Sequence, residues 1–88
     1  MTDNAIEKEL SSQHNTLGEL LRSERIKLGL EIKEVVEETR ISELNLRAME
    51  EDNYSALPAL AFAKGLYTIY AKKLNLDTDT ITTRLVQE

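Results

Sequence analysis

Residues 23–52 read SERIKLGLEIKEVVEETRISELNLRAMEED and predict two short helices, at 32–39 and 43–51, joined by a tight turn. Ser42 is a good N-cap for the second helix because its hydroxyl can accept a hydrogen bond from a free backbone N–H of the first turn. The apolar residues that should face inward from these two helices are Val35, Val36, Leu46 and Met49. Two short helices joined in this way form a helix-turn-helix.

A further helix is predicted on the N-terminal side, at 17–28, where leucines recur at helical spacing. Thr16 is its N-cap, and Glu19 three residues later completes a capping-box pattern. Gly29 should end this helix because glycine adopts the left-handed conformation at little cost.

Two more helices are predicted on the C-terminal side. Pro58 suits the first turn of a fourth helix, where its missing N–H costs nothing, and this helix should run to about Leu74. Asp77 should cap a final helix. The sequence therefore predicts an all-α fold of five helices with a helix-turn-helix in the middle.

Length and composition restrict the possible functions. The 88 residues suffice for one small domain, predicted over 16–88, with 1–15 as a flexible N-terminal leader. There is no cysteine, no apolar run approaches the roughly 20 residues of a membrane span, and the N-terminus is polar, so we expect a cytoplasmic chain. We find no catalytic triad, phosphate-binding loop or metal-ligand spacing, so neither an enzyme nor a metal or cofactor site is predicted.

Residues 23–52 also resemble the DNA-binding domains of phage repressors, the Xre-like or lambda-repressor-like family. Arg25, the Gly29–Leu30 pair and Glu50 match positions typical of that family. The resemblance implies a compact five-helix fold. It also implies a buried ion pair in which Arg25 and Glu50 tie the first helix to the third.

A narrower resemblance extends over most of the chain. The segments LGELLRSER (17–25), AMEEDNYSALPA (48–59) and FAKGLYTIYAKKLNLD (62–77) are similar to the cytoplasmic domain of the RodZ cell-shape proteins. In that family the domain binds the actin-like protein MreB, chiefly through the fourth helix. A basic linker and a membrane helix usually follow there. The resemblance thus implies a protein-docking domain that can belong to the cytoplasmic part of an inner-membrane protein.

The alternative is a DNA-binding transcriptional regulator of the Xre type. Its base-reading residues would be Glu43, Leu44, Asn45 and Arg47, at the start of the recognition helix. Residues 31–52, however, hold eight acidic and three basic side chains, and the whole chain has a net charge of −5. Because DNA affinity depends largely on neutralising phosphates, this balance disfavours DNA binding.

Residues 53–74 contain three lysines and no acid, in contrast to the helix-turn-helix. At 100° per residue, the apolar arc of the fourth helix is about twice as wide as the ~100° stripe that a surface helix needs. The middle of the arc, including Tyr67 and Tyr70, is expected in the core. One edge is left over, and the partner-binding residues predicted there are Phe62, Lys64, Gly65, Ile69, Lys72 and Lys73. Dimerisation of the chain through the same helix is a third possibility.

Overall fold

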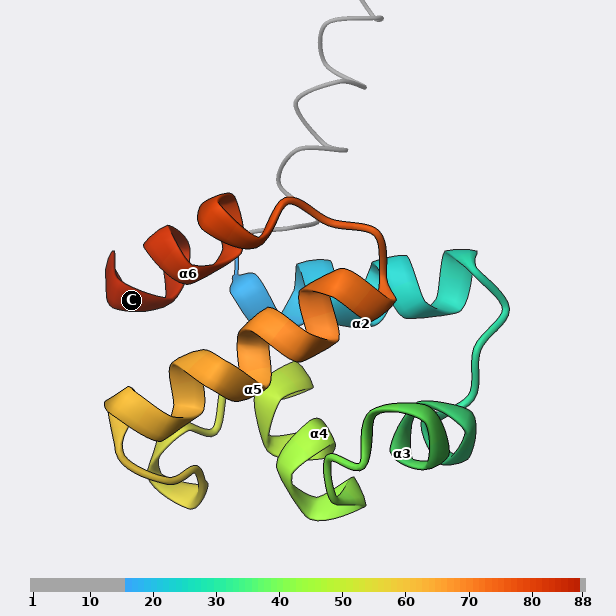
Figure 1. The fold of residues 1–88 in the computed structure, drawn as a ribbon, viewed down its shortest axis with the longest axis horizontal. Helices are drawn as coiled ribbons and strands as arrows, with labels where there is room; N and C mark the ends of the chain where they lie inside the picture. Colours follow the sequence, from blue (N-terminus) through green and yellow to red (C-terminus); the bar gives the residue numbers. More distant parts are fainter. Residues whose placement is uncertain (1–15, 88) are drawn as a thin grey trace, which may run out of the picture.

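The computed structural model describes residues 16–87, and in this range it contains five α-helices and no strand (Figure 1). The helices are α2 (Leu17–Lys27), α3 (Ile32–Thr39), α4 (Glu43–Glu50), α5 (Leu60–Lys73) and α6 (Thr78–Gln87), with a short 3-10 turn, η1, at Tyr54–Ala56. The predicted all-α class is therefore confirmed. The predicted leader, residues 1–15, lies outside the described residues.

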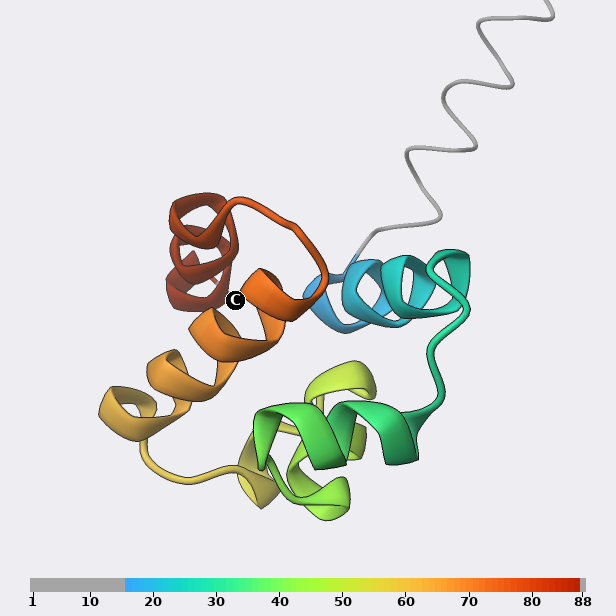
Figure 2. The same ribbon diagram turned by 45° about the vertical axis from the view of Figure 1, so that its right-hand side comes forward.

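Helix α5 has a central position in the structure. It packs along α6 on one side and against α3 on another, while α2 packs against α4 (Figures 1 and 2). Helices α3 and α4 form the predicted helix-turn-helix. None of the described helices is both long and apolar enough to cross a membrane.

Three of the helices begin at the caps that the sequence predicts. The side chains of Thr16, Ser42 and Asp77 each accept a hydrogen bond from the backbone N–H three residues further along the chain, at 3.0–3.1 Å. Asp77 also accepts the hydroxyl of Thr80 at 2.6 Å. These two bonds from Thr80, the hydroxyl bond first, lower the pKa of Asp77 because they favour its charged form.

The predicted start of α5 is wrong by two residues. Pro58 does not lie in the first turn, because the helix begins at Leu60 and Ala59 is the N-cap residue. Both Leu57 and Ala59 have extended backbone angles, with ψ of 159° and 152°. Proline disfavours the helical conformation of the residue before it, so the chain stays extended through this segment. The predicted ends at 28 and 51 differ by one residue from the observed ones, within the usual fraying.

A residue with positive φ follows each of the first four helices. Gly29 has φ of 73°, as predicted for the end of α2. Arg40, Asp52 and Asn75 have φ of 66°, 57° and 63° after α3, α4 and α5. Asn and Asp tolerate this region better than most residues, whereas arginine does so at some cost. Each of these residues lets the chain leave the helical path directly after a helix end.

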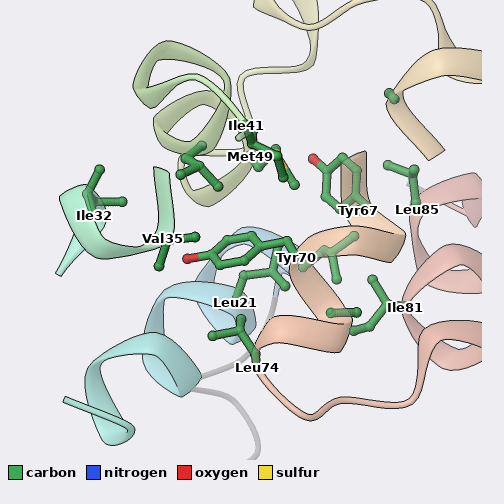
Figure 3. Packing of buried hydrophobic residues seen from close by; sticks show 14 residues of the cluster. Leu21, Ile32, Val35, Ile41, Met49, Tyr67, Tyr70, Leu74, Ile81 and Leu85 are labelled. Atoms are coloured by element: carbon green, nitrogen blue, oxygen red, sulfur yellow. The ribbon is translucent and has the colours of Figure 1, made fainter. Parts of the chain in front are cut away.

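The core is one cluster of apolar side chains drawn from all five helices (Figure 3). Tyr67 and Tyr70 project from α5 into this cluster and are fully buried, so the prediction that they belong to the core is confirmed. The other fully buried large side chains are Leu17, Leu21, Val35, Leu46, Met49, Leu74 and Ile81. Val36, also predicted to face inward, is only partly buried at the edge of the cluster.

Candidate protein-docking surface

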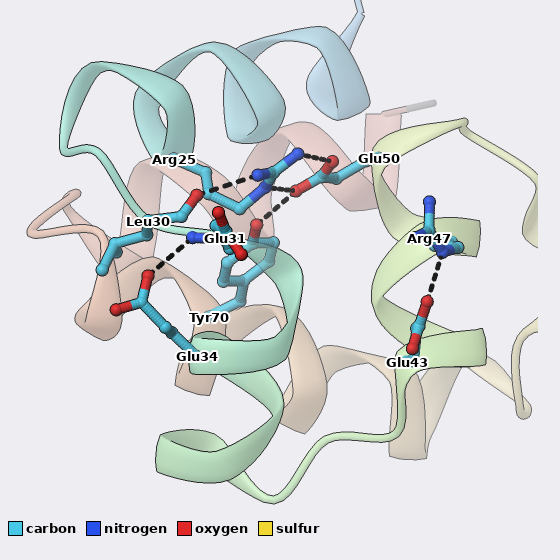
Figure 4. A network of polar contacts seen from close by, with 8 residues as sticks. All are labelled: Arg25, Leu30, Glu31, Glu34, Glu43, Arg47, Glu50 and Tyr70. Carbon is cyan, nitrogen blue, oxygen red and sulfur yellow. Dashed lines mark hydrogen bonds and ion pairs between the residues drawn. The ribbon is translucent and has the colours of Figure 1, made fainter.

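A network of polar side chains joins α2, α4 and α5 inside the domain (Figure 4). Arg25 Nε donates to Glu50 Oε2 at 2.7 Å and Arg25 Nη2 donates to Oε1 at 3.0 Å, which is a bidentate pair. Arg25 Nη1 also donates to the carbonyl of Leu30 at 2.9 Å. The ion pair that the sequence predicts is thus present in the structure.

Tyr70 completes this network from α5. Its hydroxyl donates to Oε2 of Glu50. Burial raises the pKa of Tyr70, and the hydrogen bond to Glu50 raises it further. The hydrogen bond to Glu50 likewise raises the pKa of Arg25, although burial acts in the opposite direction. Tyr70 therefore stays a neutral donor and Arg25 a cation, and their bonds to Glu50 link α2, α4 and α5.

The outer face of α5 is uncovered by the described chain. Phe62 is 73% exposed and Ile69 is 43% exposed, both large values for apolar side chains. Gly65 and Lys72 are exposed on the same side of the helix, whereas Lys64, which is also exposed, lies about 160° around the helix from Phe62. A Cβ built on Gly65 would meet no atom within 4 Å, so packing inside the domain does not require a glycine there. We call Phe62, Gly65, Ile69 and Lys72 the α5 outer face.

Lys73 lies differently from the other predicted partner-binding residues. Its ammonium forms an ion pair with Glu38 of α3, and its side chain is only 27% exposed. The structure therefore places Lys73 at the contact between α5 and α3, at the border of the outer face.

The candidate base-reading residues lie along α4, with Glu43 at its first position and Arg47 in its last turn. Leu44 is 75% exposed and Asn45 is partly buried. Arg47 is exposed, and its Nε donates to Glu43 of the same helix at 2.8 Å (Figure 4). Two of the four candidate residues are thus engaged with each other, although an exposed pair of this kind is weak.

Comparison with known proteins agrees with the helix-turn-helix geometry. A family model described as a helix-turn-helix domain matches residues 20–81, most of the chain. The chain belongs to this helix-turn-helix domain family.

One similar relative is the cytoskeleton protein RodZ of Streptococcus pneumoniae. It is 34% identical over 71 residues, which cover 81% of this chain and 26% of that protein. The chain thus spans about a quarter of the length of the curated relative that it matches. No solved structure gives a significant match. The resemblance to the RodZ family is confirmed, and the chain is a RodZ-like helix-turn-helix domain.

The RodZ-like domain also has a groove that the sequence did not predict. A hollow of about 300 Å³ lies between the loop before α5, the start of α5 and the end of α6. Its lining residues are Tyr54, Leu57, Pro58, Leu60, Ala63, Leu85 and Val86. Only the packing of α5 on α6 brings these residues together, so neither helix on its own signals the groove.

Metal binding receives no support from the arrangement of side chains. Among the described residues, no group of three or more His, Cys, Asp or Glu side chains could hold a metal ion. The exposed apolar features described above are the α5 outer face, Leu44 at the start of α4, and the groove.

Proposed function

We propose that this domain is a non-catalytic protein-interaction module that docks an actin-like cytoskeletal protein of the MreB type, on the cytoplasmic side of the cell, in the control of bacterial cell shape. The observation that carries the proposal is the α5 outer face, where Phe62 is 73% exposed on a helix without acidic residues. The similarity to a cytoskeleton protein supports the choice of partner.

The physical basis is a pair of apolar anchors on the same side of α5 as an exposed lysine. A few buried aromatic or aliphatic anchors usually provide most of the binding energy of an interface, and Phe62 and Ile69 can fill that role. Lys72 would attract an acidic patch on the partner, which mainly raises the association rate. Gly65 would let the backbone of the partner approach the helix closely.

Two exposed apolar residues allow a matched test of this proposal. Phe62 on α5 and Leu44 on α4 are 73% and 75% exposed, so neither Phe62→Ala nor Leu44→Ala should change the stability of the domain much. Titration with purified MreB from the same organism should show that Phe62→Ala weakens binding by about 30-fold, the value for a hot-spot residue. Leu44→Ala should bind like the unchanged domain. Equal binding by Phe62→Ala, or a loss only with Leu44→Ala, would contradict the proposal.

DNA binding remains the alternative because the helix-turn-helix family includes it. Its support is the fold and the exposed start of α4, and the acidic charge of residues 31–52 opposes it. Titration with random duplex DNA at low salt tests it directly. Binding that Arg47→Ala reduces and Phe62→Ala leaves intact would favour DNA over docking.

A further inference from the structure

We propose that the groove between α5 and α6 is a second docking site, separate from the α5 outer face. Its occupant would be a short peptide segment of a partner protein that carries one large apolar side chain and, about one helical turn away, one carboxylate. The site thus goes beyond the docking of an actin-like protein through Phe62.

One end of the groove is apolar and open. Leu60 and Val86 at its rim are 51% and 56% exposed, although both are large aliphatic residues. Between them lies the hollow of about 300 Å³ described above, the lower end of the size range of ligand pockets. A hollow of this size can receive one aromatic or branched aliphatic side chain.

The other end of the groove is polar and positively charged. A second hollow adjoins the first, and Val86 lines both. Its other lining residues are Lys64, Thr82, Thr83 and Gln87. Among residues 16–87, Lys64 is the only charged residue that lines either hollow, and helix α5 contains no acid. The negative charge that complements Lys64 would therefore come from the occupant.

Charge also distinguishes a peptide from a membrane as the occupant. A protein that binds anionic lipid needs a cluster of basic residues, since each contributes about 1 kcal/mol near the surface. The groove offers one lysine in a chain with a net charge of −5. One apolar hollow next to one cation instead suits an apolar anchor and an acidic side chain on the same peptide.

The groove and the outer face lie on different sides of α5. Leu60 and Lys64 are four residues apart and share one side of the helix. Phe62 lies about 160° around the helix from each of them, given 100° per residue. A substitution on one side can therefore leave the other surface intact.

Selection from a random peptide library displayed on phage, with the full 88-residue chain as bait, tests the proposal. The enriched peptides should share an apolar residue and an Asp or Glu about one turn apart. When such a synthetic peptide is titrated into isotope-labelled protein, the amide signals of Leu60, Ala63, Lys64 and Val86 should shift. Lys64→Glu should lower affinity for this peptide about fivefold, as expected for an exposed ion pair. A peptide with Lys in place of its acidic residue should bind the Lys64→Glu variant more tightly than it binds the unchanged domain.

Lys72→Glu is the matched charge control, because Lys72 is exposed on α5 but does not line the groove. Phe62→Ala should retain peptide binding even where it abolishes docking of the actin-like protein, so the two proposals can fail separately. The groove proposal is overturned if no peptide is enriched, if the enriched peptides are basic, or if Phe62 and Ile69 shift in place of the groove residues. Shifts at the groove that grow with protein concentration alone would identify a second copy as the occupant and also overturn it.

Discussion

At the scale of single residues, Glu50 is a buried carboxylate held by side chains from two other helices. Its carboxylate accepts two hydrogen bonds from Arg25 and one from Tyr70, and the residue is buried. A buried ion pair contributes little net stability by itself, but removal of one partner leaves a charge without compensation. The three residues therefore act mainly to fix the relative positions of α2, α4 and α5.

Tyr70→Phe tests this description at the level of one hydroxyl. The ring is kept, so the substitution removes only the hydrogen bond to Glu50 and should lower the free energy of unfolding by about 2 kcal/mol, as for hydrogen bonds to charged groups. Urea denaturation monitored by circular dichroism would measure the change.

Tyr54→Phe is the control, because the hydroxyl of Tyr54 donates to Asp52 in an exposed position. Its effect should stay below about 0.5 kcal/mol. If Tyr70→Phe and Tyr54→Phe changed the free energy of unfolding equally, the hydrogen bonds from Arg25 would suffice to compensate the buried carboxylate of Glu50.

These contacts could be predicted from the sequence only in part. The pair of Arg25 and Glu50 was predicted from the resemblance to repressor domains. The helical wheel placed Tyr70 in the core, but a wheel gives the direction of a side chain and not the atom that its hydroxyl meets. The ion pair of Lys73 and Glu38 was missed for the same reason, since it depends on how α5 crosses α3.

At the scale of elements, α5 belongs to both the core and the surface. Tyr67 and Tyr70 are fully buried on its inner side, and Phe62 and Ile69 are exposed on its outer side. Its exposed Gly65 weakens the helix without any benefit to internal packing. Another glycine, Gly18 in α2, has the opposite environment, with backbone oxygens of Glu50 and Met49 only 2.5 and 2.7 Å from the position of a Cβ.

The two glycines allow a paired prediction. Gly65→Ala should raise the free energy of unfolding by about 1 kcal/mol, because alanine is the better helix former. Gly18→Ala should lower it by about 1–3 kcal/mol, because backbone must move to admit the methyl group. Thermal unfolding of both variants measures these changes.

Gly65→Ala also tests whether a partner covers the α5 outer face. If a partner approaches the α5 outer face closely, Gly65→Ala should weaken docking severalfold despite its greater stability. Unchanged docking would show that the interface leaves Gly65 uncovered.

Helix starts were predicted correctly from the sequence where a side-chain N-cap marks them. Thr16, Ser42 and Asp77 predicted three helix starts because each cap depends on residues adjacent in the chain. The start of α5 lacks a side-chain cap, and Pro58 alone was a poor guide. Arg40 illustrates a further limit, since its left-handed conformation follows from the packing of α3 against α4 and not from a preference of arginine.

At the scale of the whole molecule, charge divides the domain into two regions. The helix-turn-helix segment, residues 31–52, carries eight acids and three bases, whereas residues 53–74 carry three lysines and no acid. This division was visible in the sequence because charges can be counted without a structure. The groove was not visible, because α5 and α6 build it jointly.

The charge division predicts how docking responds to salt. The rate of association with the actin-like partner should fall severalfold between low and high ionic strength, because salt screens the attraction of an acidic patch to Lys72. Stopped-flow measurements would give the rates. Phe62→Ala should change mainly the dissociation rate and keep the same salt dependence. An association rate that rises with salt would contradict the assignment of this face.

The network around Glu50 also has a consequence for how the domain folds. Its three side chains come from positions 25, 50 and 70, so the complete set of bonds exists only when α2, α4 and α5 are all in place. A fragment that ended before α5 would bury the carboxylate with fewer donors and expose much of the core. We therefore expect the helix-turn-helix to fold and unfold together with α5 as one cooperative unit.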